Sequence, residues 1–309
     1  MIYISFIILF ISLIFIYIKI ARFYNFFDIP NSRSSHNIPT VRGGGIIFPI
    51  SIFFSYYFSN YEYTFFFFSL IFLSIISFID DVYSISNLFR LIVQIFVSIA
   101  IIYQLEITLV WWTYIILLFV IVGGINCFNF MDGINGLTSL YSLVYFVFLL
   151  IINYNISFVD NNFLIYPTIA VLAFSFFNFR KKALCFCGDI GSISIGAISL
   201  FLMFKLVFYT ENISYVLLLL IYALDSGYTI LIRVFKKHNI FQPHREHLYQ
   251  KLVDSKLFSH LSVSIFFSVL QLIVNLLLIN FINNYYIIIL LFFISSISYI
   301  FVVSKFKNV

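Results

Sequence analysis

Eleven apolar runs, each close to the length of a membrane-spanning helix, occupy most of this 309-residue chain. A helix needs roughly 20 apolar residues to cross the hydrocarbon core of a bilayer. Hydrophobic residues make up 63% of the chain and charged residues 9%, a balance that excludes a water-soluble domain. We therefore predict an all-α, polytopic integral membrane protein that forms a single membrane-embedded domain over residues 1–309. The predicted spans are 2–21, 44–59, 63–79, 88–104, 109–125, 137–153, 163–179, 192–209, 213–232, 262–280 and 285–303.

The Lys and Arg residues predict the orientation of these spans, because short cytoplasmic loops carry the positive excess. With eleven spans, every loop that holds Lys or Arg falls on one face, which we predict to be cytoplasmic. The charged residues of the opposite loops are all acidic: Glu62, Glu106, Asp160 and Glu211. Lys205 alone lies inside a span. Joining 44–59 and 63–79 into one re-entrant hairpin would invert every later span and destroy this separation. The net charge of +5 then reflects orientation rather than nucleic-acid binding.

Three short aspartate motifs end apolar runs on this same face. They are Asp80-Asp81, Asn129-Phe130-Met131-Asp132-Gly133 and Gly188-Asp189-Ile190-Gly191. An ionised carboxylate next to lipid needs water, a cation or a hydrogen-bond partner. Carboxylate oxygens without a His or Cys cluster favour Mg²⁺ or Mn²⁺ over zinc, and Mg²⁺ often completes its shell with substrate phosphate. Each motif alone is explained equally well by a helix cap or a turn, so the argument rests on their convergence.

Two basic loops on the same face supply groups that bind phosphate. The first contains Arg33, His36 and Arg42, followed by glycines 43–45, whose backbone N–H groups we expect to approach an anion. The second contains His244, Arg245 and His247. Arg offers a planar fork of donors, and His donates or shuttles a proton. Acidic metal ligands and basic phosphate ligands are therefore expected on one face.

In order and in residue type, these motifs resemble those of the polyprenyl-phosphate N-acetylhexosamine-1-phosphate transferase superfamily, of the WecA and MraY type. The resemblance runs from about Asp28 to Lys251. Residues 78–81 are similar to the family's paired-aspartate segment, residues 126–136 to its long Asn/Asp motif, and residues 186–192 to its metal-binding motif. Residues 243–250 look most like the branch that initiates O-antigen and capsule synthesis.

The resemblance implies a phosphoglycosyltransferase that depends on Mg²⁺, with Mn²⁺ as a substitute. It would move an N-acetylhexosamine-1-phosphate from a UDP-sugar to undecaprenyl phosphate and release UMP. The sugar would be a UDP-N-acetylhexosamine such as the 6-deoxy FucNAc or QuiNAc, with GlcNAc as the fallback. The enzyme would lie in the bacterial inner membrane with its active site facing the cytoplasm. A homodimer is one assembly to expect, and no nucleic-acid partner is implied.

The same resemblance implies a role for individual residues. Asp189 and Asp81 would hold the metal, and Asp80 would bind or deprotonate the lipid phosphate with support from Asp81. His244 and His247 would act at the phosphate or the sugar. The residues implied in substrate binding are Arg33, His36, Thr40, Arg42, Asn126, Asn129, Asp132, Asn135, Asn178, Phe186 and Arg245, with Phe186 stacking on uracil.

Two other classes of protein compete with this interpretation. A transporter is the main alternative, because polytopic helices with scattered acids are also typical of transporters. Transporters, however, place coupling carboxylates near the midplane of the bilayer, whereas these acids lie at span ends. A non-catalytic assembly scaffold leaves the polar motifs unexplained. The sequence assigns no role to Lys205 or to Asp225, which lies in the last turns of the ninth span.

Overall fold

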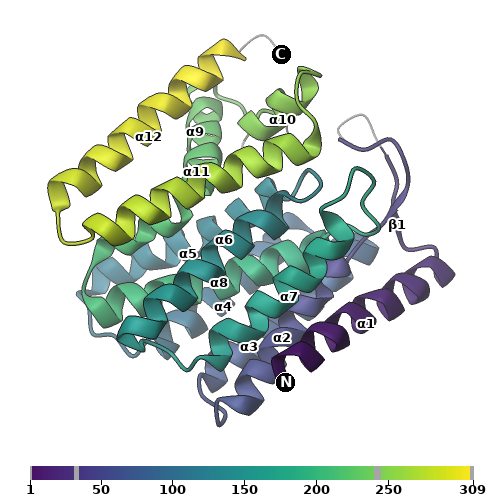
Figure 1. Ribbon diagram of the computed structural model, residues 1–309, viewed down its shortest axis with the longest axis horizontal. Coiled ribbons are helices and arrows are strands. Elements are labelled where there is room, and N and C mark those ends of the chain that lie inside the picture. The colour runs from purple at the N-terminus through teal and green to yellow at the C-terminus, as the bar shows by residue number, and fades with distance from the viewer. Residues whose placement is uncertain (1, 31–34, 240–244, 307–309) are drawn as a thin grey trace.

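The structure, a computed structural model, describes residues 2–30, 35–239 and 245–306. Nearly all regular structure in these residues is helical, as predicted (Figure 1). The α-helices are α1 (Ile2–Phe23), α2 (Ile47–Phe58), α3 (Thr64–Tyr83), α4 (Asn87–Gln104), α5 (Trp111–Met131), α6 (Leu137–Ile156), α7 (Asn162–Asn178), α8 (Gly188–Thr210), α9 (Leu220–Phe235), α10 (Leu248–Asp254), α11 (His260–Phe281) and α12 (Tyr285–Lys305). Two 3-10 helices, η1 (Gly44–Ile46) and η2 (Ile213–Leu219), precede α2 and α9, and strands β1 (Phe27–Asp28) and β2 (Thr40–Val41) pair antiparallel.

Every predicted apolar run lies in a helix, and the polytopic membrane class is confirmed, but the count of eleven spans is not. Among the described residues, nine helices are long and apolar enough to cross a bilayer. Two further apolar helices, Gly44–Phe58 and Asn162–Asn178, are shorter. At 1.5 Å per residue each reaches only about 25 Å, less than the roughly 30 Å of hydrocarbon. These two short helices pack against each other, so they share one region of the fold.

Helix α8 runs through the centre of the molecule, and α2, α3 and α5 pack around it (Figure 1). Small side chains allow this packing, because membrane helices associate through close contact rather than through the hydrophobic effect. A Cβ on Gly196 would lie 3.0 Å from Phe128 Cβ of α5, and Ser194 Oγ lies 2.8 Å from Ser74 Oγ of α3. The first turn of α8, which carries Asp189, is therefore held by three neighbouring helices.

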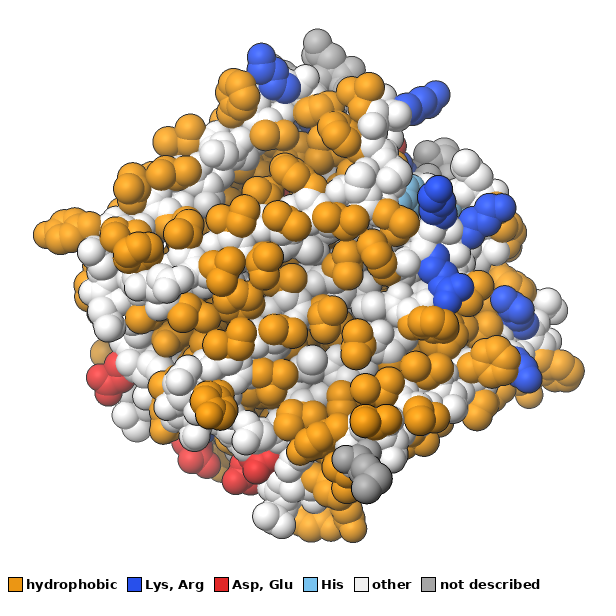
Figure 2. All heavy atoms as spheres, in the orientation of Figure 1, with side chains coloured by type: hydrophobic (Ala, Val, Ile, Leu, Met, Phe, Trp, Pro, Cys, Tyr) orange, Lys and Arg blue, Asp and Glu red, His pale blue; other side chains and the backbone are white. Residues whose placement is uncertain are grey.

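On the surface seen in Figure 2, basic and acidic side chains gather at opposite ends of the molecule. On the face in Figure 2, Lys and Arg gather toward the upper right and Asp and Glu toward the lower left, with an apolar surface between them. We call these the basic end and the acidic end. The large exposed apolar side chains include many on α1 and α12, which is the surface expected of helices that face lipid.

Lys205, the cation inside a span, lies five residues before the acidic end of α8. Its Nζ lies 5.3 Å from the centroid of the Tyr63 ring, at the start of α3. A cation over an aromatic face gains roughly 0.5–2 kcal/mol. The ammonium group is therefore placed near the end of the helix, beside a ring that stabilises it.

Candidate active site

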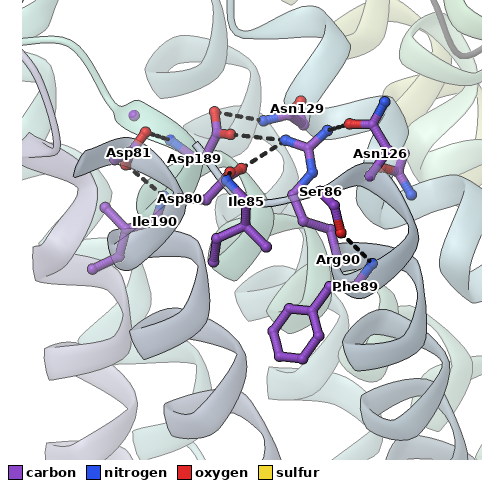
Figure 3. A network of polar contacts seen from close by, with 12 residues as sticks. Asp80, Asp81, Ile85, Ser86, Phe89, Arg90, Asn126, Asn129, Asp189 and Ile190 are labelled. Carbon is purple, nitrogen blue, oxygen red and sulfur yellow. Dashed lines mark hydrogen bonds and ion pairs between the residues drawn. The ribbon is translucent and has the colours of Figure 1, made fainter. Parts of the chain in front are cut away.

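The three aspartate motifs meet at the basic end, on helices far apart in the sequence (Figure 3). Asp80 and Asp81 occupy the last turn of α3, Asn129 the last turn of α5, and Asp189 the first turn of α8. Helices α3 and α8 include their motifs, and α5 continues to Met131 within the 129–133 motif, although the predicted apolar runs stop short of all three. Each motif is therefore fixed by a rigid element instead of a mobile connection.

Asp81 caps the N-terminus of α8 from another helix. Its Oδ1 accepts a hydrogen bond from the Asp189 backbone N–H at 2.9 Å, and its Oδ2 accepts one from the Ile190 N–H at 3.1 Å. The residue before α8, Cys187, makes no side-chain cap of its own. Arg42 Nε lies 2.7 Å from Asp81 Oδ1, and the Asp81 side chain is 0% exposed. Asp81 thus fixes the backbone that carries Asp189.

Asp189 lies between two guanidinium groups. Its Oδ1 accepts hydrogen bonds from Arg42 Nη2 and Asn129 Nδ2, both at 3.1 Å, and its Oδ2 lies 3.3 Å from Arg90 Nη1. Arg90 Nη1 also lies 2.7 Å from Asp80 Oδ2, so one guanidinium bridges two carboxylates. Arg90, in the first turn of α4, was not among the predicted site residues. Its position ten residues after Asp80 was the only signal, and that spacing matches no motif.

Asp80 is held by the turn that follows it. Its Oδ1 accepts a hydrogen bond from the Ile85 N–H at 2.6 Å, across the left-handed residue Ser84. With Arg90 on its other oxygen, the carboxylate is fixed in direction and neutralised by one cation. The negative Asp80 carboxylate would repel an anionic substrate. It can lie next to such a substrate only if Arg90 contacts both of them.

A metal ion can be matched to this donor set. Within the described part of the chain, no group of three or more His, Cys, Asp or Glu side chains is arranged to hold a metal. Mg²⁺, however, takes only one or two carboxylates and fills its shell with water and substrate phosphate. Asp189 lines the cavity described below and, among the residues that the structure describes, its oxygens contact only side chains, whereas both oxygens of Asp81 are held by backbone N–H groups and the side chain is 0% exposed. Asp189 is thus the carboxylate that fits Mg²⁺ best, and metal binding by Asp81 stays a prediction.

The remaining residues of the long Asn/Asp motif point in different directions. Asn129 also donates to Ser192 Oγ at 3.0 Å, so it faces α8. Asn126 pairs instead with Gln94 of α4, with Nδ2 to Oε1 at 2.7 Å. Asp132 Oδ1 accepts from Thr138 Oγ1 at 2.6 Å, and burial raises the pKa of Asp132 to about 8. This carboxyl group is therefore largely protonated at neutral pH.

Two further asparagines tie the loops around the cavity together. Asn135 Nδ2 donates to the carbonyl oxygens of Arg180 and Lys181, at 2.9 and 3.3 Å. Asn178 accepts from the Gly136 N–H at 2.8 Å and donates to the Cys185 carbonyl at 3.0 Å. Both side chains line the cavity while they hold its walls together.

The glycines after Arg42 serve packing instead of anion binding, which corrects the expectation from the sequence. The N–H groups of Gly44 and Gly45 donate to the carbonyl oxygens of Phe186 and Cys187, at 2.8 and 3.0 Å, so they are not available to a phosphate. A Cβ on Gly45 would lie 2.3 Å from Gly191 Cα, on α8. The glycines let the first loop lie directly on the start of α8, where Val41 also forms a bridge with Cys185.

A polar cavity of about 340 Å³ opens above these residues. Eight of the predicted site residues line it: His36, Arg42, Asn129, Asp132, Asn135, Asn178, Phe186 and Asp189. The rings of His36 and Phe186 meet edge to face, with centroids 4.8 Å apart. Asp28, Ser35, Gln250 and His260 also line the cavity and were not predicted. His260 begins α11, beyond the last motif, and nothing in its local sequence marked it.

The other predicted residues lie off the cavity wall. Thr40 Oγ1 donates to the Ile38 carbonyl at 3.0 Å. Arg245 Nε donates to Asp254 Oδ2 at 2.7 Å, and its Nη2 reaches Ser35 Oγ at 3.0 Å, which joins the two basic loops. His247 is 2% exposed and its Nδ1 lies 3.0 Å from Asp225 Oδ1. Arg33 and His244 lie outside the described residues.

A second, larger cavity of about 840 Å³ lies within the membrane-spanning part of the molecule. It is lined almost entirely by apolar side chains of α5, α8, η2 and α9, with Phe292 of α12. Helices α5 and α8 contribute to both cavities. An anionic group in the polar cavity and a hydrocarbon chain in the apolar one would therefore contact the same pair of helices.

Comparison with known proteins shows which family this chain resembles. A profile of the family described as Glycosyl transferase family 4 matches residues 63–207, the segment that holds all three aspartate motifs. The probable undecaprenyl-phosphate N-acetylglucosaminyl 1-phosphate transferase of Bacillus subtilis (strain 168) is 25% identical over 213 residues, 63% of this chain and 59% of the relative. These matches support the resemblance of the motifs to those of the polyprenyl-phosphate hexosamine-1-phosphate transferase superfamily.

Shorter matches link the chain to a second branch of this superfamily. The phospho-N-acetylmuramoyl-pentapeptide-transferase of Wolbachia sp. subsp. Drosophila simulans (strain wRi) is 40% identical over 82 residues, 26% of this chain and 24% of the relative. The protein of that name from Bacillus velezensis is 37% identical over 94 residues, 30% of this chain and 29% of the relative. The chain thus matches less than two thirds of the length of each of these relatives. Arg42 and the wall formed by Gln250 and His260 lie outside the profile match.

Proposed function

We propose that this protein transfers an N-acetylhexosamine-1-phosphate from a UDP-sugar to undecaprenyl phosphate. The observation that carries the proposal is that helices α5 and α8 line both a polar cavity, which contains Arg42 and Asp189, and an apolar cavity in the membrane-spanning part of the molecule. One substrate is a water-soluble diphosphate and the other is a phosphate on a long hydrocarbon chain. The similarity of the chain to Glycosyl transferase family 4 and to the Bacillus subtilis relative supports the same reaction.

In the proposed reaction, an oxygen of the lipid phosphate attacks the β-phosphorus of the UDP-sugar. The bond from that phosphorus to the bridging oxygen breaks, UMP leaves with the electron pair, and the sugar remains on a polyprenyl diphosphate. Arg42 and Arg90 would offset the charge of the phosphates. Asp80 would orient the lipid phosphate through Arg90, or would take its proton directly on a carboxylate oxygen. Mg²⁺ held by Asp189, with Asn129 beside it, would supply a Lewis acid that neutralises the diphosphate.

The remaining cavity residues would bind the donor. Phe186 and His36 present rings that suit the uracil base, and Asn135 and Asn178 line the same wall. The nearly neutral Asp132 can donate a proton in a hydrogen bond to a diphosphate oxygen. The donor would be a UDP-N-acetylhexosamine. We favour FucNAc or QuiNAc as its sugar, with GlcNAc as the fallback, and the product would initiate O-antigen or capsule synthesis.

The proposed location is the bacterial cytoplasmic membrane, with the basic end facing the cytoplasm. The separation of Lys and Arg from the acids supports this orientation. The cytoplasm is also where a UDP-sugar would reach the cavity at that end. A homodimer stays a prediction, which light scattering of the protein in detergent would test.

UMP release by the purified protein tests the proposal. The reaction contains undecaprenyl phosphate in detergent, Mg²⁺ and one UDP-sugar from a panel, and is repeated with EDTA in place of Mg²⁺. Asp189→Asn is expected to lose UMP release, and Asp160→Asn, the same change at the acidic end, is expected to retain it. If no sugar in the panel yields UMP, or if Asp189→Asn matches the wild type, the proposed function is wrong.

The transporter alternative finds no support in the described residues. Lys205 lies near a helix end on an aromatic ring, and the buried carboxylate of Asp225 is occupied by backbone and side-chain donors. Neither residue is available to bind and release a coupling ion in the middle of the bilayer.

A further inference from the structure

Helix α9 presents three buried polar side chains on one face. Asp225, Thr229 and Arg233 are spaced four residues apart, which aligns them along a helix, and each is at most 5% exposed. Asp225 is fully buried. Buried charges at this spacing are costly unless they hold specific partners. Thr229 Oγ1 donates to Asp225 Oδ1 on the same helix, and the other partners described below belong to residues 239–249 or to α12.

Asp225 holds the start of α10 and the histidine before it. Its Oδ1 accepts the Leu248 N–H at 3.1 Å and its Oδ2 accepts the Tyr249 N–H at 3.3 Å. His247 Nδ1 lies 3.0 Å from the same Oδ1. The Tyr299 hydroxyl of α12 also donates to this carboxylate, at 3.3 Å. One side chain of α9 therefore fixes the position of three consecutive residues.

Arg233, two turns further along α9, holds the other part of the loop. Its Nη1 lies 2.7 Å from Glu246 Oε1, and its Nη2 donates to the Asn239 carbonyl at 2.6 Å. With Asp225, it grips the described residues on both sides of the segment 240–244. We call Asp225 and Arg233 together the α9 clamp.

The segment that the clamp holds lies against the nucleotide end of the site. Tyr249 is 1% exposed, and its hydroxyl donates to the Phe130 carbonyl at 2.8 Å. A Cβ on Gly133 would lie 2.1 Å from the same hydroxyl oxygen, so ring and turn are in direct contact. Gln250, the next residue, lines the polar cavity. Any shift of this segment would move both the cavity wall and the turn between Asn129 and Gly133.

We propose that Asp225 and Arg233 are positioning residues that hold residues 245–250 against the 130–133 turn and so fix the cavity wall. His247 is held by the α9 clamp, since its imidazole faces Asp225 instead of the cavity. The effect on catalysis rests on the proposed function, whereas the effect on local structure does not. Carboxylate chemistry is required at position 225, because two backbone N–H groups and an imidazole need both oxygens as acceptors, and asparagine offers only one.

Hydrogen exchange measures the clamp without any assay of activity. In Asp225→Asn, the amides of Leu248 and Tyr249 are expected to exchange at least tenfold faster, because their acceptor is lost, while exchange in α8 stays as in the wild type. Lys236→Gln, which removes an exposed charge from the end of the same helix, is the matched control and should leave both unchanged. Unchanged exchange at 248–249 in Asp225→Asn would overturn the proposal, as would faster exchange throughout the chain.

Steady-state UMP release tests the consequence for catalysis. A wall displaced by about 1 Å is expected to lower kcat/KM about 10²-fold in Asp225→Asn. Tyr249→Phe, which loses the hydrogen bond to Phe130, should lower it less, and the double variant should be no worse than Asp225→Asn alone, because both changes act through one segment. If the two losses in kcat/KM multiply in the double variant, Asp225 and Tyr249 do not act through one segment and the proposal is refuted. A wild type that releases no UMP would refute the proposed function and leave the exchange result to judge the clamp.

Discussion

Replacing Asp81 by Asn should destabilise the protein as well as inactivate it. Asp81 receives three donors, Arg42 Nε and the backbone N–H groups of Asp189 and Ile190, in a site that is closed to water. Asn offers one acceptor oxygen, so at least one buried donor loses its partner, which costs about 1–3 kcal/mol. The bonds that remain also lose their charge-assisted character, which roughly halves their strength. We expect the free energy of unfolding to fall by about 3 kcal/mol.

The measurement is an SDS titration of the protein in mixed micelles, without substrate, followed by circular dichroism. Asp160→Asn is the matched control, because Asp160 Oδ1 also accepts a backbone N–H, that of Asn162 at 2.8 Å, but at an exposed position. There the loss should be about 1 kcal/mol or less. Asp189→Asn should lose activity and keep its stability, because its partners are side chains that can turn toward water.

An opposite result would refute the capping role. Asp80, Asp81 and Asp189 are three carboxylates in one small volume, and they repel one another. If Asp81 were present for catalysis alone, neutralising it would relieve this repulsion, and the variant would be as stable as the wild type or more so. Such a result would favour the original prediction that Asp81 is a metal ligand.

Three further predictions concern the surroundings of this network. Gly45→Ala should lower the free energy of unfolding by about 1–3 kcal/mol in an SDS titration, and should also lower kcat, because the new Cβ would lie 2.3 Å from Gly191 Cα and push the first loop off α8. Stability equal to that of the wild type would contradict this packing. Arg90→Met, of similar length but uncharged, should lower kcat for UMP release about 10²-fold, and an unchanged kcat would show that bridging Asp80 and Asp189 is not needed. Because burial raises the pKa of Asp132 to about 8, its proton stabilises the fold fully below about pH 4, and this contribution is lost as the pH rises to about 8. Asp132→Asn should remove that component from the stability measured between pH 4 and pH 9, and a variant with the wild-type pH dependence would refute the shifted pKa.

The apolar runs predicted where the helices lie, but not where each helix ends. The run 63–79 became α3, which continues to Tyr83, and the run 192–209 became α8, which begins at Gly188. Hydropathy ends where polar residues begin. These helices continue because Arg42, Arg90 and the facing backbone N–H groups satisfy the carboxylates of the motifs. That support comes from distant parts of the chain and leaves no local pattern.

The motifs predicted which residues come together at one end of the molecule, and the roles of these residues stay predictions. The residues implied at positions 129, 132, 135, 186 and 189 do line one cavity, because each follows or starts a rigid helix whose direction the topology sets. Arg90 and His260 were missed, since they enter through tertiary packing alone. Helix α10 was missed because its seven residues are too few to show a clear period. The predicted position of His247 beside the substrate depended on a loop whose contact with Asp225 no sequence pattern records.

The cap that Asp81 places on α8 also bears on how the protein is made. The two partners of that hydrogen bond are 108 residues apart, with the four helices α4 to α7 still to be synthesised between them. At roughly 5–20 residues per second, the ribosome needs about 5–20 s to cover that distance. During this interval Asp81 has no helix to cap, whereas Asp80 is followed closely by its own partners, Ile85 and Arg90. The nascent protein must therefore keep the Asp81 carboxylate in water until the start of α8 is made, so this part of the site forms only late in synthesis.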